Sequence, residues 1–174
     1  CGGDYYAESA TLSSPGYPES YPANVECEWT LHTAPGNQIL LEFSAFDLQL
    51  SSNCDRDYLE IREQSPTGKR LGTFCGNNAT EIRSTETIWM KFKSDEGVAG
   101  TGFMMEYSFQ HGSDVSGPSG VIASPMYPRP FTKVEEVHWR ITVEVGFSVK
   151  IEFDDFHMDG FSEGECDYWS DGLM

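Results

Sequence analysis

The stretch FDLQLSSNCDRDYLEIRE, residues 46–63, passes from an acidic loop into a strand. From position 58 onward polar and apolar side chains largely alternate, and this pattern predicts a half-buried β-strand. The preceding loop gathers three acidic side chains around a cysteine: Asp47, Asp55 and Asp57, with Cys54 between them. The stretch therefore predicts strands joined by a loop that concentrates negative charge at one place.

The same alternation recurs in short segments along the first 111 residues. Further strand-like segments cover residues 28–32, 39–43, 87–93 and 102–109. Between them lie Pro-Gly, Pro-Thr-Gly and Cys-Gly-Asn-Asn turns, and no segment shows the capped 3.6-residue period of a helix. Short strands at this spacing predict an all-β, antiparallel sandwich.

The chain carries a strong negative charge. It has 28 Asp plus Glu against 11 Lys plus Arg among 174 residues, for a net charge of −17. Binding to nucleic acid or to an anionic membrane surface is disfavoured, because both need Lys and Arg to meet phosphates. The charge favours cationic partners instead, either metal ions or basic side chains of another protein.

Five cysteines indicate an oxidising compartment. None lies in a C-x-x-C zinc pattern, so disulfides are favoured over a metal site. Four cysteines fall in the first 75 residues and allow three pairings. Closure of the shorter loops favours two bonds, Cys1–Cys27 and Cys54–Cys75. Cys166 has no local partner, so it either pairs beyond the end of the chain or is free.

Other features fit an extracellular location, either secreted or in the ectodomain of a membrane protein. Asn78-Ala79-Thr80 is a sequon for N-glycosylation of Asn78 in a polar turn. No apolar run approaches the roughly 20 residues that span a bilayer, so this segment is not expected to insert into a membrane. The absence of a signal peptide is expected for a mature or excised fragment.

An internal repeat relates the two parts of the chain at an offset of 110 positions without a gap. Matching residues include Tyr17-Pro18 with Tyr127-Pro128, Trp29 with Trp139, Glu42-Phe43 with Glu152-Phe153, and Asp57-Tyr58 with Asp167-Tyr168. This many matches in one register indicate two homologous copies of a domain.

The repeat divides the chain into three parts. The first copy covers residues 1–111, and the polar stretch GSDVSGPSG, residues 112–120, links the copies or opens the second. The second copy, residues 121–174, has about half the length of the first. We therefore expect it to be the N-terminal part of a domain that is cut short.

The motifs of the first copy resemble those of the CUB domain family. In order, they are CGG, SPGYPESYPANVECEW, FDL, CDRDYLEIR, LGTFCG, KFKSD and GTGFMMEYSF. The second copy resembles the family in part, through SPMYP, HWRI, FDDF and CDYW, but has Val137 in place of Cys27. The resemblance implies a jelly-roll-like β-sandwich in two tandem copies, the second incomplete, that acts as a non-catalytic recognition module.

Many CUB domains carry one calcium ion at an end of the sandwich, and the resemblance implies its ligands in the first copy. They fall on Gln49, Asp57 and Asp95. Calcium takes roughly six to eight oxygen ligands, mostly carboxylates and carbonyls. Gln49 stands where the family usually has an acid, and its neutral amide implies weaker binding. Asp47 and Asp55 either compensate for it or are surface turn residues.

In the second copy the corresponding ligands are Asp159, at the position of Gln49, and Asp167, at the position of Asp57. Both charged ligands are therefore present there, and a third would lie beyond the end of this sequence.

The family also uses a tyrosine, together with the acidic ligands, to receive a basic side chain of a partner. The resemblance places this role on Tyr17 and, in the second copy, on Tyr127. The alternative for Tyr17 is a turn residue that packs on the edge of the sandwich.

The function implied is calcium-tuned recognition of a protein that presents Lys or Arg, such as a receptor or channel subunit. The first hypothesis is a receptor or receptor-auxiliary ectodomain of the cubilin-like or neuropilin–tolloid-like kind. The rivals are the non-catalytic region of a secreted astacin-like or complement-type protease and a soluble adhesion protein. No H-E-x-x-H, G-x-S-x-G or ordered Ser-His-Asp set occurs, so the chain is not expected to be an enzyme.

Overall fold

The computed structural model describes residues 1–130 and 136–158, and every regular element within them is a β-strand. The strands of the first copy are β1 (Gly2–Tyr5), β2 (Ser9–Ser13), β3 (Glu26–Leu31), β4 (Gln38–Asp47), β5 (Tyr58–Glu63), β6 (Arg70–Phe74), β7 (Ile82–Ser84), β8 (Ile88–Lys93) and β9 (Gly102–Gln110). The all-β class predicted from the alternation is confirmed.

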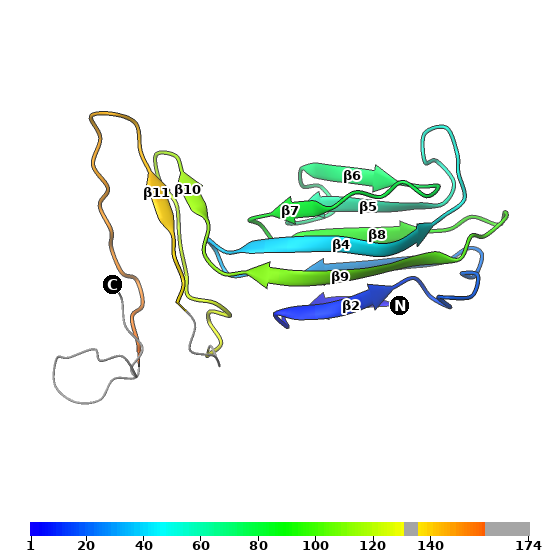
Figure 1. The fold of residues 1–174 in the computed structure, drawn as a ribbon, viewed down its shortest axis with the longest axis horizontal. Helices are drawn as coiled ribbons and strands as arrows, with labels where there is room; N and C mark the ends of the chain where they lie inside the picture. Colours follow the sequence, from blue (N-terminus) through cyan, green and yellow to red (C-terminus); the bar gives the residue numbers. More distant parts are fainter. Residues whose placement is uncertain (131–135, 159–174) are drawn as a thin grey trace.

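The first copy is a sandwich of two sheets (Figure 1). One sheet has five strands in the order β1-β3-β8-β5-β6, and the other has four in the order β2-β9-β4-β7. Neighbouring strands are antiparallel except β1 and β3, which run parallel. Strands far apart in the chain are neighbours in each sheet, so the predicted jelly-roll-like sandwich is also confirmed.

Alternation along each strand sends one row of side chains into the core. On β3, Cys27, Trp29 and Leu31 are buried, whereas Glu26 and Glu28 between them are exposed. This is the period of two that a pleated strand imposes. Strand β8 departs from this period: four of its six residues are buried, and it lies at the centre of the five-stranded sheet.

Aromatic rings join the two sheets through the core. Phe103 on β9 contacts Trp29, Phe46 and Phe92, with ring centroids 6.0, 6.2 and 5.6 Å apart. Phe92 in turn contacts Tyr21 in a T-shaped, edge-to-face arrangement with ring centroids 5.2 Å apart. Such pairs contribute about 0.5–1.5 kcal/mol each beyond the burial of apolar area. The cluster therefore couples the sheets to the loop that carries Tyr21.

Three loops meet at one end of the sandwich, on the right in Figure 1. They cover residues 14–25, 48–57 and 94–101. The backbone N–H of Asn24 donates to the carbonyl of Asp95 at 2.9 Å and so joins the first loop to the third. This end is called the loop end below.

Two disulfides secure the first copy, and they join the pairs favoured by loop closure. Cys1 is bonded to Cys27, which attaches the N-terminus to β3. Cys54 is bonded to Cys75, which attaches the loop of residues 48–57 to the end of β6. The acidic loop is therefore fixed by the Cys54–Cys75 disulfide and by strand β5, which follows it directly.

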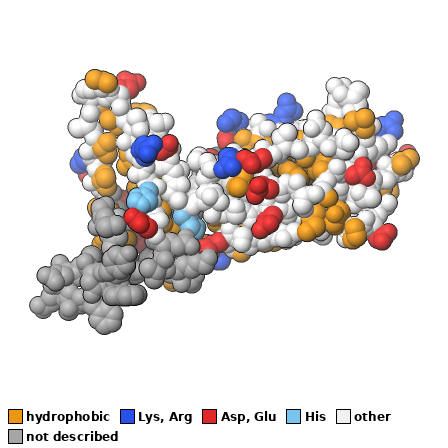
Figure 2. Space-filling view, viewed as in Figure 1, with side chains coloured by type: hydrophobic (Ala, Val, Ile, Leu, Met, Phe, Trp, Pro, Cys, Tyr) orange, Lys and Arg blue, Asp and Glu red, His pale blue; other side chains and the backbone are white. Residues whose placement is uncertain are grey.

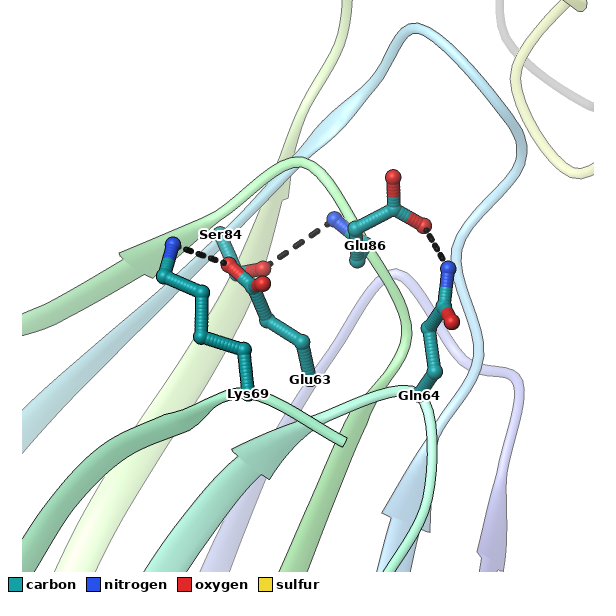
Figure 3. Close-up of polar contacts among 5 residues, drawn as sticks. All are labelled: Glu63, Gln64, Lys69, Ser84 and Glu86. Carbon is teal, nitrogen blue, oxygen red and sulfur yellow. Dashed lines mark hydrogen bonds and ion pairs between the residues drawn. The ribbon is translucent and has the colours of Figure 1, made fainter. Parts of the chain in front are cut away.

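The opposite end of the sandwich is closed by polar contacts (Figure 3). Gln64 donates from Nε2 to Glu86 Oε2 at 2.9 Å, and the backbone N–H of Glu86 donates to Ser84 Oγ at 3.1 Å. Lys69 Nζ lies 3.4 Å from Glu63 Oε1 within the same region. The bond between Gln64 and Glu86 links the β5–β6 hairpin to the turn between β7 and β8, and the other two contacts lie within these segments.

Beyond the first copy the chain forms β10 (Asp114–Ser116) and β11 (Arg140–Thr142). These strands pair in parallel, in the register that β1 and β3 use, shifted by 110 positions. The internal repeat is thus visible in the strand pairing. The stretch of residues 112–120, expected to link the copies or open the second, contains β10.

The turn between β3 and β4 adjoins the second copy, at the end of the sandwich away from the loop end (Figure 1). The buried side chain of Asn37 donates to the carbonyl of Ala123 and accepts from the N–H of Gly112, both at 3.1 Å. Trp139 Nε1 donates to the carbonyl of Gly36 at 2.9 Å. The loop end is therefore not covered by the described part of the second copy.

Replacing Phe92 by alanine tests the aromatic coupling. Phe92 is fully buried, so Phe92→Ala should lower the free energy of unfolding by about 3–5 kcal/mol through lost contacts and a cavity. Urea unfolding followed by tryptophan fluorescence measures this change.

The matched control is Phe147→Ala, because Phe147 is 72% exposed. This variant should change the free energy of unfolding by less than about 0.5 kcal/mol. Equal effects of the two substitutions would contradict the assignment of Phe92 to the core.

Candidate functional site

The loop end brings together the three side chains predicted as calcium ligands in the first copy. Asp57 directly precedes β5, Asp95 follows β8, and Gln49 follows β4. Each therefore lies within two residues of a strand end, where the hydrogen-bonded ladder restricts the backbone. A rigid scaffold presents all three at one place.

Asp57 is the buried centre of this group, with only 1% of its surface exposed. Its Oδ2 accepts a hydrogen bond from Tyr21 Oη at 2.6 Å, and its Oδ1 accepts one from the N–H of Asp95 at 2.7 Å. A buried carboxylate without such donors would be strongly destabilising. Each oxygen keeps a further lone pair that can bind a cation.

Gln49 adds a buried amide oxygen that lacks a partner. Its backbone N–H donates to Tyr21 Oη at 3.0 Å, but its side-chain Oε1 is buried and accepts no hydrogen bond. An unsatisfied buried polar atom costs about 1–3 kcal/mol, so its presence calls for an explanation. A bound cation would satisfy this oxygen.

A glycine leaves space beside these oxygens. The N–H of Gly97 donates to Asp95 Oδ1 at 2.6 Å. A Cβ at Gly97 would lie 2.7 Å from Asp95 Oδ1 and 3.2 Å from Gln49 Oε1, so both oxygens border the space that the missing side chain leaves. These hard oxygen donors fit calcium. In the part of the chain that the structure describes, no group of three His, Cys, Asp or Glu side chains could hold a metal ion, and the third candidate ligand here is an amide.

Tyr21 links two of the candidate ligands through hydrogen bonds of its hydroxyl group. Burial of its ring, followed by its hydrogen bond to Asp57, raises the pKa of Tyr21 to about 12. The phenol therefore stays protonated at neutral pH and donates to the Asp57 carboxylate, while its oxygen accepts from the backbone of Gln49. One side chain thus orients two of the candidate ligands.

Tyr21 was not predicted from the sequence, which pointed to Tyr17. Tyr17 is half-buried in a turn where its N–H donates to the carbonyl of Ser14 at 3.2 Å. Within residues 1–130 it makes no hydrogen bond with the candidate ligands, whereas Tyr21 bonds directly to Asp57. Comparison of the two copies does not single out Tyr21, because the second copy has Phe131 at the matching position.

The other two acids of the loop make separate contacts. Asp47 Oδ2 accepts from the N–H and the hydroxyl of Thr101, at 2.9 and 3.1 Å, and so ties β4 to the third loop. Asp55 is exposed, and its N–H donates to Ser51 Oγ at 3.0 Å. Asp55 therefore fits the alternative of a surface turn residue, whereas Asp47 is the last residue of β4.

The predicted residues of the second copy are described only in part. Tyr127 Oη donates to Asp155 Oδ2 at 3.3 Å, and the charge of Asp155 raises the pKa of Tyr127. Asp159, Asp167 and Cys166 lie outside the described residues. Asn78, the predicted glycosylation site of the first copy, is exposed between β6 and β7.

The first copy is thus a small β-sandwich module that carries its polar site on loops at one end. A family model described as the CUB domain matches residues 1–107 and 111–170. The chain belongs to the CUB domain family and contains two matches to it.

Curated relatives are much longer than this chain. It is 42% identical to the cubilin homolog of Drosophila melanogaster over 173 residues, which cover 94% of the chain and 5% of that protein. It is 38% identical to human cubilin over 153 residues, or 86% of the chain and 4% of that protein. Identity to human tolloid-like protein 1 is 34% over 174 residues, or 97% of the chain and 17% of that protein.

Solved CUB structures share the fold. A crystal structure of the MASP-1 CUB2 domain bound to Ca2+ matches with a TM-score of 0.55 and 31% identity, over 62% of this chain and 99% of that chain. The CUB1-EGF-CUB2 region of human MASP-1/3 matches with a TM-score of 0.54 and 30% identity, over 59% and 42% of the two chains.

The raised pKa of Tyr21 predicts a specific loss of stability at high pH. Below pH 10.0, the ordinary pKa of tyrosine, the phenol is protonated in both folded and unfolded chains. Between that value and about 12 the unfolded chain ionises first, so the free energy of unfolding falls as pH rises.

Tyr21→Phe should make this fall shallower, because the substitution removes the shifted group. Urea unfolding at several pH values across this window measures the slope. The control Tyr6→Phe removes a partly exposed phenol away from the loop end and should leave the slope as it is. A wild-type slope in Tyr21→Phe would disprove the role assigned to the buried phenol.

Proposed function

We propose that the first copy is a calcium-dependent recognition module of an extracellular protein and binds a basic side chain of a protein partner. The observation that carries the proposal is the meeting of Gln49 Oε1, Asp57 and Asp95 at the loop end, where the amide oxygen is buried without a partner. Calcium would be held by these side chains and would neutralise the two carboxylates.

Charge at the loop end supports a basic partner. Together with Asp47 at the end of β4, the three loops carry six acidic side chains and one basic one: Glu19, Asp47, Asp55, Asp57, Asp95 and Glu96, with Arg56. One calcium ion would compensate only part of this negative charge. A Lys or Arg of a partner would therefore gain from charge-assisted hydrogen bonds with the acids that remain accessible.

Several features support an extracellular setting. The first copy has two disulfides, and the sequon at Asn78 is exposed and can accept a glycan without unfolding. Across the described ranges, no helix is long and apolar enough to cross a membrane. The chain spans about a twentieth of the cubilin homolog it resembles, so the role of the whole protein is inferred from this part alone.

We infer a cubilin-like parent as the first candidate, because identity reaches 42% with a cubilin homolog. The second candidate is the CUB region of a tolloid-like protein, supported by 34% identity over 97% of the chain. In both cases this segment would recognise a partner protein and leave any chemistry to other parts of the parent.

Calcium should stabilise the first copy. Addition of about 5 mM calcium should raise the melting temperature by about 3 °C or more, since a ligand that binds only the folded state stabilises it. Asp57→Ala should remove the shift. Differential scanning fluorimetry with calcium and with a chelator measures it.

Asp55→Ala is the matched control, because Asp55 is an exposed acid on the same loop whose N–H donates to Ser51 Oγ. This variant should keep the shift. An unchanged melting temperature of the wild-type chain in millimolar calcium would exclude the site.

Gln49→Glu should strengthen calcium binding. The substitution supplies a third carboxylate at the position of the orphan amide oxygen, and the number of charged ligands tunes calcium affinity. An increase on the order of tenfold is expected by isothermal titration calorimetry. Gln64→Glu, on the β5–β6 hairpin at the other end, is the matched control and should leave the affinity unaltered. A weaker or equal affinity in Gln49→Glu would argue against Gln49 as a ligand.

A further inference from the structure

The described part of the second copy lies against the end of the first copy opposite the loop end (Figure 2). There the turn between β3 and β4 contacts the stretch of residues 112–123. The carbonyl of Pro35 accepts a hydrogen bond from the N–H of Ala123 at 2.8 Å. The carbonyl of Gly36 accepts one from Ser113 Oγ, also at 2.8 Å. The stretch is therefore attached to the first copy near both of its ends.

One side chain, that of Asn37, contacts both ends of this stretch. It is buried, with 1% of its surface exposed. Its Oδ1 accepts from the N–H of Gly112, and its Nδ2 donates to the carbonyl of Ala123, both at 3.1 Å. Movement of either end away from Asn37 would leave a buried polar group without a partner, which is destabilising.

The turn that carries Asn37 does not require this side chain. The N–H of Asn37 donates to the carbonyl of Ala34 at 3.2 Å and closes the turn. In the second copy the N–H of Phe147, at the position that matches Asn37, donates to the carbonyl of Glu144 at 3.1 Å. Because phenylalanine has no amide group, the same backbone turn forms without one. The amide of Asn37 therefore serves the contact with the second copy.

A second contact between the copies involves Tyr6, which follows β1 directly. Its ring stacks on the imidazole of His32, with ring centroids 4.4 Å apart and planes 5° apart. His32 Nε2 in turn lies 3.0 Å from Asp4 Oδ1. The guanidinium carbon of Arg129, in the second copy, lies over the Tyr6 ring, 4.4 Å from its centroid. A cation over an aromatic face is attracted to it, so Arg129 attaches the second copy through a residue outside the stretch 112–123.

We propose that this end of the first copy is a docking surface for the second copy, and that Asn37 holds the two copies in one orientation. The proposal is independent of calcium binding. A stretch rich in Gly and Ser ordinarily behaves as a flexible linker. Here residues 112–120 are instead part of the junction, because Asn37 fixes the chain on either side of them. The junction would then set the direction in which each loop end points.

Residual dipolar couplings of the full chain test the fixed orientation. Couplings from strands of the first copy and from residues 136–158 of the second should fit one alignment tensor in the wild-type chain. The double variant Asn37→Ala/Arg129→Ala lacks both contacts and should require two tensors. A wild-type chain that requires two tensors would overturn the docking surface.

Hydrogen exchange of the Ala123 N–H measures the contribution of Asn37. This N–H donates to the carbonyl of Pro35 and not to the Asn37 side chain, so its exchange rate reports opening of the junction. Asn37→Ala should accelerate its exchange about tenfold or more, since a buried polar contact is lost. The N–H groups of β8, measured in the same sample, report the stability of the first copy. An acceleration at Ala123 no larger than that at β8 would show that Asn37 only stabilises the first copy, and would overturn its role in the junction.

Arg129→Ala removes the second contact without changing a residue of the first copy. It should accelerate exchange at Ala123 about twofold to fivefold, as expected for the loss of an exposed cation–π contact. An unchanged rate would exclude the Arg129 contact from the junction.

The matched controls are Asn77→Ala, at an exposed asparagine of the first copy, and Lys150→Ala, at an exposed lysine that pairs with Glu152 in the second. Both should leave the rate at Ala123 unaltered. Acceleration in these controls equal to that in Asn37→Ala and Arg129→Ala would contradict the specific contacts proposed.

Discussion

The loop end depends on the buried carboxylate of Asp57. Tyr21 and the backbone of Asp95 both donate to this group, so one acidic side chain contacts two other loops. If these loops moved apart, the buried carboxylate of Asp57 would lose its hydrogen-bond donors. A buried carboxylate without donors is strongly destabilising. Two further hydrogen bonds, from the N–H of Gln49 to Tyr21 Oη and from the N–H of Gly97 to Asp95 Oδ1, position the other oxygens of the candidate site.

Much of the fold could be predicted from local patterns. Alternation within segments such as 57–62 follows from burial of one strand face, and the disulfide pairs follow from the shorter loops. The role of Tyr21 could not be predicted in this way, because its partner lies 36 positions away and loops have no periodicity that reports side-chain direction. Strand β10 escaped prediction as well, because three residues are too few to show an alternation.

The two copies differ at two positions of this site. The first copy has a phenol at Tyr21 and a neutral amide at Gln49, whereas the second has Phe131 and Asp159 at these positions. Phenylalanine cannot donate the hydrogen bond that Tyr21 donates to Asp57, so the copies cannot stabilise the corresponding aspartate in the same way. These differences need not alter the sandwich, because the strands form its core whereas the loops form the candidate site.

The contacts of Asn37 with the second copy lie at the opposite end of the sandwich from Asp57. Strand β4 runs between these ends for 10 residues, a span of roughly 30 Å. If further copies were joined in this manner, their loop ends would be separate binding sites spaced along the chain, and would not combine into one site. A partner with several basic segments at a matching interval could then gain avidity from weak individual contacts, since each attachment raises the effective concentration for the next.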